Sequence, residues 1–160
     1  MERLDSTKGI LDRLSAVANS GFAIALHVRF TTPTYLFQTY DNAWMHYYSS
    51  AGLVMHDPTV RWGFEHDGTI RWEDLAPLDK NGVLDAAREH GLAFGVTMAL
   101  SDGDSKSIAS FSKSDLEFSE DEVNAIRDML VTLHRETMPR DDDAEFQDAL
   151  KKLSVDLTHG

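Results

Sequence analysis

The sequence predicts an α/β (α+β) fold, an α-β-α sandwich with a central antiparallel sheet of about five strands. Three observations lead to this prediction. Apolar and polar residues alternate over residues 22–30, which marks a strand with one buried face. Apolar residues recur at helical spacing over residues 3–19 and 119–137. The predicted elements are helix, two strands, helices, strand, helix, two strands and helices, an order that fits antiparallel hairpins covered by helices on both faces.

The N-terminal half supplies the first hairpin and two helices. A helix over residues 3–19 ends at Gly21, and the strand over residues 22–30 follows it. Pro33 separates this strand from a second one over residues 35–40, and the two are expected to pair. The next helix begins at residue 41 or 42 and ends near Gly52. Pro58 opens a helix of about two turns, with Asp57 as its N-cap.

The C-terminal half supplies the remaining strands and the clearest helix start. A short strand is expected over residues 69–72, a helix over 82–90, and strands over 94–100 and 107–112 joined by a turn at 101–104. Ser119 and Glu122 form a capping box for the helix that ends near Pro139. An amphipathic helix over residues 142–153 has Phe146, Ala149, Leu150 and Leu153 on one side.

Composition limits the classes of function. The chain has 160 residues, enough for one domain with a sizeable core and a small ligand. Its 15 basic and 27 acidic side chains give a net charge of −12, without the basic stripe that nucleic-acid binding needs. It has no cysteine, no long apolar run and no secretory signal pattern. We therefore expect a cytoplasmic protein that neither inserts into a membrane nor binds DNA through this region.

Motifs of catalysis are missing from the sequence. His46, His56 and His66 are ten residues apart, which fits no ligand spacing on one helix or strand. The chain has no H-E-x-x-H, no G-x-S-x-G and no phosphate-binding loop. We therefore expect no enzyme, no catalytic residue, no metal site and no cofactor.

A group of aromatic side chains and one acid suggests a binding pocket. Tyr40, Trp44 and Tyr48 are four residues apart, which places their rings on roughly one face. Such a stripe is also typical of plain core, and Asp57 before Pro58 is also typical of a helix N-cap. Together they offer an indole donor, two phenols and a carboxylate acceptor beside a large apolar surface. These groups match a neutral ligand that carries an amide, carbonyl oxygens and an apolar tail.

The same residues resemble a known family. Trp44, Tyr48, Asp57-Pro58, Trp72 and Gly95 stand at the intervals of the N-terminal autoinducer-binding domain of LuxR-type quorum-sensing transcriptional regulators. The intervals are 4 residues from Trp44 to Tyr48, 9 from Tyr48 to Asp57, and 15 from Asp57 to Trp72. The segment Gly91–Met98 also resembles the family, and the resemblance covers residues 11–133. It implies that the ligand is an N-acyl-homoserine lactone.

The resemblance further implies a role for each site residue. Trp44 would donate to the lactone carbonyl, Asp57 would accept from the ligand amide, and Tyr40 would donate to the amide carbonyl. Tyr48 and Trp72 would pack around the ligand. The side chain that reaches a 3-oxo group or a bridging water would be that of Ser110 or, as an alternative, Ser112. Thr97 and Leu92 would also line the pocket, and acyl length would depend on Phe22, Ile24, Val54, Val60 and Ile108.

Domain organisation and partners are expected from the same resemblance. Residues 1–138 would form the autoinducer-binding domain. Residues 139–160 would form a C-terminal helix and linker towards a helix-turn-helix domain that this chain does not contain, and Asp156-Leu157-Thr158 resembles the start of that domain. We expect a homodimer, with the helix over residues 119–137 as the contact surface, and DNA binding only through the missing domain.

Other interpretations stay open from the sequence. A natural stand-alone domain of this kind would act as a modulator by heterodimerisation with a full-length relative, leaving a dimer that grips only one DNA half-site. A sensor of the PAS or GAF type would bind a different small metabolite, but it leaves the Trp44–Asp57–Trp72 spacing unexplained. A purely structural interaction module would have no closed cavity behind Trp44 and Asp57.

Overall fold

The computed structural model describes residues 2–30, 32–140 and 142–159, with side chains as far as Ser154. Its centre is one five-stranded sheet in the order β2-β1-β5-β4-β3. All neighbouring strands are antiparallel. The strands are β1 (Gly21–Arg29), β2 (Thr32–Gln38), β3 (Gly68–Arg71), β4 (Phe94–Asp102) and β5 (Ser105–Lys113). The predicted fold class is therefore confirmed.

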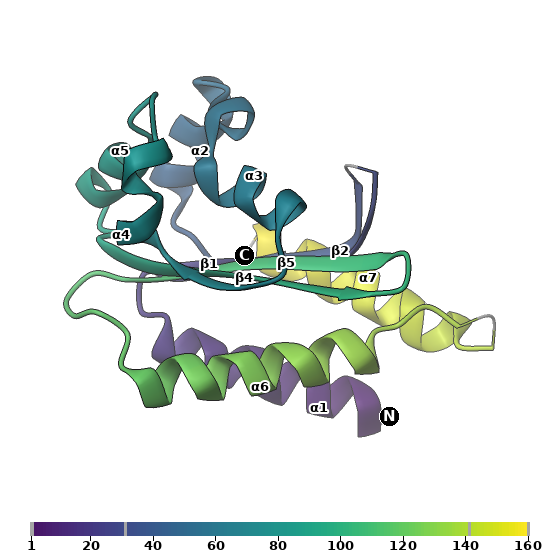
Figure 1. Cartoon of the computed structure of the whole chain (residues 1–160). Coiled ribbons are helices and arrows are strands. Elements are labelled where there is room, and N and C mark those ends of the chain that lie inside the picture. Colours follow the sequence, from purple (N-terminus) through teal and green to yellow (C-terminus); the bar gives the residue numbers. More distant parts are fainter. Residues whose placement is uncertain (1, 31, 141, 160) are drawn as a thin grey trace.

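Helices cover both faces of this sheet (Figure 1). On one face α1 (Glu2–Val17) packs against α6 (Glu120–Glu136), and α7 (Ala144–His159) packs on β2 and α1. The opposite face is covered by short helices: α2 (Asn42–Ser50), η1 (Leu53–His56), α3 (Pro58–Glu65), α4 (Trp72–Leu75), η2 (Ala76–Leu78) and α5 (Val83–Glu89). Within the described residues no helix is long and apolar enough to cross a lipid bilayer.

The two faces of the sheet differ because side chains alternate along each strand. Phe22, Ile24 and Phe111 are fully buried against the α1–α6 layer. Ala23, Ala25 and Ser110 come between them in sequence and point to the layer of short helices. The alternation expected over residues 22–30 is wrong beyond Leu26, because β1 has a bulge at His27. His27 takes a positive φ of 52° and is buried on the α6 side, whereas Phe30 is 98% exposed.

Local capping determines where three helices begin. The Ser119 hydroxyl accepts from the Glu122 backbone N–H at 3.1 Å, and Glu122 accepts from the Ser119 backbone N–H at 2.9 Å, which confirms the capping box of α6. Asp41 caps α2 by accepting from the backbone N–H of Trp44 at 2.9 Å. Asp57 caps α3, as expected, by accepting from the backbone N–H of Thr59 at 2.9 Å.

Some element boundaries differ from the sequence predictions. Trp72, expected to end a strand, instead begins α4, because β3 is only paired up to Arg71. The hairpin of β4 and β5 is paired as far as Asp102 and Ser105, so its turn is two residues long rather than four. The last helix begins at Ala144 and extends to His159, beyond the predicted residues 142–153. Its Phe146 and Leu150 are buried in the core beside α1.

Candidate functional site

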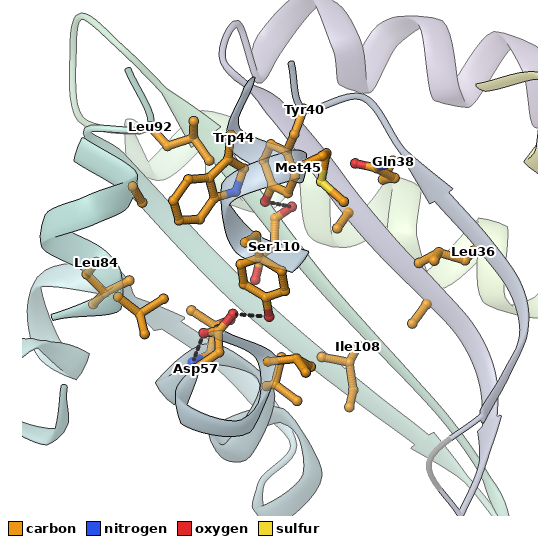
Figure 2. Close-up of a pocket in the computed structure, with 18 of the residues that line it drawn as sticks. Leu36, Gln38, Tyr40, Trp44, Met45, Asp57, Leu84, Leu92, Ile108 and Ser110 are labelled. Carbon is orange, nitrogen blue, oxygen red and sulfur yellow. Dashed lines mark hydrogen bonds between the residues drawn. The ribbon is translucent and has the colours of Figure 1, made fainter. Parts of the chain in front are cut away.

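A cavity of about 300 Å³ lies between the sheet and the layer of short helices. Its floor comes from β1, β2 and β5, and its roof comes from α2, α3, α4 and α5 (Figure 2). The residues that line it are Ala23, Ala25, Val28, Pro33, Leu36, Gln38, Tyr40, Trp44, Met45, Tyr48, Val54, Asp57, Thr59, Val60, Phe64, Trp72, Val83, Leu84, Ala87, Leu92, Ile108 and Ser110.

The aromatic wall of the cavity follows from the start of α2. Because Asp41 caps this helix, Trp44 lies in its first turn and Tyr48 one turn later, with their rings 5.6 Å apart. Trp44 is only 4% exposed, and its indole nitrogen points towards Tyr40 and Ser110 (Figure 2). Tyr40 precedes the cap and lies directly against Gly21, where a Cβ atom would come within 2.8 Å of the tyrosine ring. Glycine at position 21 therefore lets Tyr40 reach the cavity.

Asp57 brings a carboxylate to the cavity wall. Its Oδ1 accepts hydrogen bonds from the backbone N–H and the hydroxyl of Thr59, at 2.9 and 2.7 Å. Its Oδ2 accepts from the Tyr48 hydroxyl at 2.8 Å and has room to accept one more donor. Burial raises the pKa of Asp57, although the bonds from Thr59 and Tyr48 oppose the shift. Burial and the nearby Asp57 carboxylate both raise the pKa of Tyr48, which therefore stays a hydrogen-bond donor.

A chain of hydrogen bonds crosses from the roof to the floor. The indole N–H of Trp72 donates to the Thr97 hydroxyl at 3.1 Å, and that hydroxyl lies 2.7 Å from the Ser110 hydroxyl. Either hydroxyl can donate in this contact, because the Thr97 oxygen can accept from both Trp72 and Ser110. Gly95 lies under the Trp72 ring, where a Cβ atom would come within 2.1 Å. The Trp72–Gly95 pair noticed in the sequence is thus a packing requirement.

Most residues singled out from the sequence meet at this one cavity. Tyr40, Trp44, Tyr48, Asp57, Trp72 and Ser110 all line it, as do Leu92, Val54, Val60 and Ile108. Thr97 is fully buried behind Ser110 rather than on the wall. Ser112 is also fully buried, and its hydroxyl donates to the carbonyl of Gly21.

Two expected tail contacts are wrong. Phe22 and Ile24, expected to limit acyl length, belong to the core on the opposite face of the sheet. The pattern of alternation identified the strand, but it did not tell which of its two faces would meet the ligand.

Several lining residues were missed by sequence reasoning. Thr59 holds Asp57 in place, and Gln38 presents a buried side-chain amide on β2. Alternation along β2 places Gln38 on the same face as Leu36, two residues before Tyr40. That inference needs the register of β2, which the sequence alone does not supply.

The cavity is chemically suited to a neutral, largely apolar ligand that has at least one N–H or O–H donor. Asp57 is the only charged side chain among the described residues that line it. An anionic ligand would face the Asp57 carboxylate without a cation to balance it. Among the described residues no group of three or more His, Asp or Glu is arranged to hold a metal ion. The cavity behind Trp44 and Asp57 also disagrees with a purely structural module, which would have no such cavity.

An α-β-α sandwich with a largely apolar cavity and a few inward polar groups is typical of a domain that binds a small molecule. Comparison with known proteins gives the particular family. The family model described as autoinducer binding domain matches residues 14–136. The chain therefore belongs to the autoinducer-binding domain family found in LuxR-type regulators, as the sequence predicted.

Individual relatives agree with this assignment. The regulatory protein SdiA of Escherichia coli strain K12 is 35% identical over 74 residues, which are 46% of this chain and 31% of SdiA. The structure of SdiA in complex with octanoyl-rac-glycerol has a TM-score of 0.61 at 24% identity, covering 84% of this chain and 57% of that one. The structure of the N-acylhomoserine lactone-dependent LuxR-family transcription factor CepR2 of Burkholderia cenocepacia has a TM-score of 0.57 at 13% identity, over 86% of this chain and 94% of that one. At these identities the two structures support the fold alone.

Proposed function

We propose that this domain is a sensor that encloses an N-acyl-homoserine lactone in the cavity between the sheet and the short helices. One observation carries the proposal: the buried carboxylate of Asp57 faces an apolar cavity whose described lining residues include no cation. A carboxylate in that position needs a neutral partner with a donor, and the amide N–H of an acyl-homoserine lactone supplies it. The charge-assisted hydrogen bond would contribute roughly 1.5–3 kcal/mol.

The polar groups of the cavity suggest how the ligand would lie. The amide N–H would donate to Oδ2 of Asp57, and the Trp44 indole would donate to the lactone carbonyl. The Tyr40 hydroxyl donates to the backbone carbonyl of Ser110 at 3.5 Å, which is long for a hydrogen bond. It would instead donate to the ligand amide carbonyl. Burial and the Asp57 carboxylate both raise the pKa of Tyr40, so its hydroxyl stays a donor.

The apolar part of the ligand would lie towards the β1–β2 hairpin. The end of the cavity near α5 is closed by Val83, Ala87 and Leu92, each of which is 2% exposed. The opposite end is lined by Leu36, Val54 and Phe64, which are 39%, 53% and 41% exposed. The compact lactone ring fits the closed end, and the acyl tail fits the end that opens to the surface.

Ligand burial would also stabilise the domain. Without a ligand the Asp57 carboxylate and the apolar walls border empty space, which costs free energy. A ligand that binds only the folded state adds about 2.7 kcal/mol to the free energy of unfolding at a hundredfold excess over Kd. We propose that the domain transmits its signal through this gain in stability. We also propose that the domain performs no chemistry on the ligand.

The wider setting is also proposed. A full regulator would bind DNA through a separate helix-turn-helix domain, act as a homodimer and work in the cytoplasm. Residues 1–138 would be the sensing unit, and residues 139–160 would connect it to that domain. A stand-alone form acting by heterodimerisation is the alternative.

The test is mass spectrometry of solvent-extracted protein, purified from cells grown with a mixture of acyl-homoserine lactones. We expect the wild type to retain one lactone with its ring intact, and Asp57→Asn and Trp44→Phe to lose it. Matched controls are Asp128→Asn on the exposed side of α6 and Trp62→Phe, which stacks on His66 outside the cavity lining. An empty but stably folded wild type, or retention by Asp57→Asn, would refute the proposal. Continuous opening of the lactone ring by the pure protein would refute the proposal that the domain performs no chemistry on its ligand.

An acyl glycerol is a second candidate ligand. It is favoured by the SdiA structure, which holds octanoyl-rac-glycerol. Its hydroxyl groups could donate to Asp57 in place of an amide, and its acyl tail needs the same apolar end. Competition between octanoyl glycerol and a lactone of equal tail length distinguishes the two. A higher affinity for the glycerol ester would make it the preferred ligand.

A further inference from the structure

The side-chain amide of Gln38 is a buried polar group at the wall of the cavity. Gln38 is 6% exposed, and its Oε1 atom has no hydrogen-bond partner among the residues that the structure describes. Leaving a buried amide oxygen unpaired costs free energy, and proteins rarely do so without a reason. Gln38 lines the cavity, so a ligand bound there would lie beside its side-chain amide (Figure 2).

Strand register places Gln38 in one polar row across the cavity floor. Gln38 pairs with Ala23 on β1, Ala23 pairs with Ser110 on β5, and Ser110 pairs with Thr97 on β4. The Cα atoms of Gln38 and Ser110 are therefore two strand spacings apart, about 10 Å. Because the Ala23 side chain between them is only a methyl group, the Gln38 amide and the Ser110 hydroxyl face the same stretch of ligand from two sides.

The next row along the sheet is apolar. Two residues closer to the hairpin, Leu36 pairs with Ala25, and Ala25 pairs with Ile108. That row lies about 7 Å from the polar one. A polar group of the ligand that faces the floor can therefore form a hydrogen bond only beside the Gln38–Ser110 row. This row would lie close to the ligand amide that Asp57 and Tyr40 would bind. In an acyl chain this corresponds to the third carbon rather than to the tail.

We propose that Gln38 is a specificity-determining residue that binds a hydroxyl group on the third carbon of the acyl chain. The inference rests on the proposed function, because it assumes that the acyl amide lies beside Asp57. A 3-hydroxyl donates to Oε1 of Gln38 and can accept from its Nε2 atom. A 3-oxo group only accepts, so it leaves Oε1 unpaired. An unsubstituted chain gives the amide neither a donor nor an acceptor. The expected order of affinity is 3-hydroxy, then 3-oxo, then unsubstituted.

The experiment measures Kd by calorimetry for these three lactones at one tail length. With the wild type we expect the 3-hydroxy ligand to bind about tenfold more tightly than the unsubstituted one, the worth of one hydrogen bond. Gln38→Leu and Gln38→Met should remove most of this ratio while still binding the unsubstituted ligand. Gln147→Leu on α7, outside the cavity, is the matched control and should keep the ratio.

The outcomes separate the two proposals. If the wild type binds none of the lactones, the proposed function fails. If all three bind but the unsubstituted or 3-oxo ligand is as tight as the 3-hydroxy one, the role of Gln38 is refuted. The same holds if Gln38→Leu weakens all three equally. The melting temperature of each unliganded variant shows that it folds, and removal of the buried amide should raise it.

Discussion

The two faces of the sheet carry different kinds of side chain on the same strands. On the α1–α6 face, Phe22, Phe37 and Phe111 are fully buried in a continuous apolar core. On the other face the small side chains of Ala23 and Ala25 lie on the central strand of the floor, and a cavity remains above them. We call the α1–α6 face the filled face and the face that borders the cavity the hollow face. We expect the filled face to contribute more to the stability of the domain, because empty space beside apolar side chains costs free energy. The predictions below test this division.

The largest expected effect on the free energy of unfolding comes from comparing two residues of β5. Phe111→Ala removes a fully buried ring from the filled face and should lower the free energy of unfolding by about 3–5 kcal/mol. Ile108→Ala enlarges a cavity that already exists, so its effect on the unliganded domain should be less than half as large. Urea unfolding of both variants measures the difference. Equal losses without ligand would contradict the division between the faces.

Acidification should also act through the filled face. His27 and His134 are buried there with their rings 4.4 Å apart. Burial, followed by the neighbouring His134, lowers the pKa of His27 to about 4 from its ordinary 6.5, and burial lowers the pKa of His134. Below pH 6.5 the unfolded chain therefore binds more protons than the folded one. The free energy of unfolding has its full value above pH 6.5 and falls as the pH drops towards 4. For His27 the loss is on the order of 3 kcal/mol.

The measurement for this pH effect is the urea midpoint between pH 7.5 and 4. His27→Asn suits the positive φ of 52° at this bulge and removes the titrating ring. It should flatten the slope between pH 6.5 and 4, even though losing the hydrogen bonds to Ser105 and Thr137 lowers stability at pH 7. The same substitution at exposed His46 is the control. An unchanged slope in His27→Asn would rule out His27 as the cause.

On the hollow face, removing a charge should not destabilise the fold. The pKa of Asp57 is raised by burial, so ionising it in the empty cavity opposes folding at neutral pH. An asparagine side chain at this position would still cap α3 through its carbonyl oxygen, and its amide N–H would donate to the Tyr48 hydroxyl, which now donates to Asp57. We expect Asp57→Asn without ligand to be at least as stable as the wild type, and to lose the thermal shift produced by lactone. Thermal melting with and without ligand tests both points, and clear destabilisation without ligand would make Asp57 a structural residue first.

The sequence predicted the filled face better than the hollow one, for a physical reason. The filled face depends on period and capping, so the strand at residues 22–26 and the capping box at Ser119 could be identified locally. The hollow face depends on strand register, on the bulge at His27 and on the packing of short helices, all of which involve residues far apart in the chain. Phe22 was assigned to the wrong face and Gln38 was overlooked because both assignments need that register. Trp44 was noticed through its spacing from Tyr40 and Tyr48, and Asp57 through its place before Pro58; the family intervals then implied a ligand-binding role for both.

The smallest effect expected concerns the open end of the cavity. If the tail lies along Leu36, Val54 and Phe64, each added methylene should contribute about 0.8 kcal/mol until the tail passes these residues. Val54→Asp places a charge where the tail ends, so it should abolish the increment for the longest tails. Leu116→Asp is the control, because Leu116 is 64% exposed and lies outside the cavity lining. Calorimetry with tails of increasing length gives the increment for each protein. If it persists unchanged in Val54→Asp, the tail lies elsewhere, and the closed end near α5 would have to open to receive it.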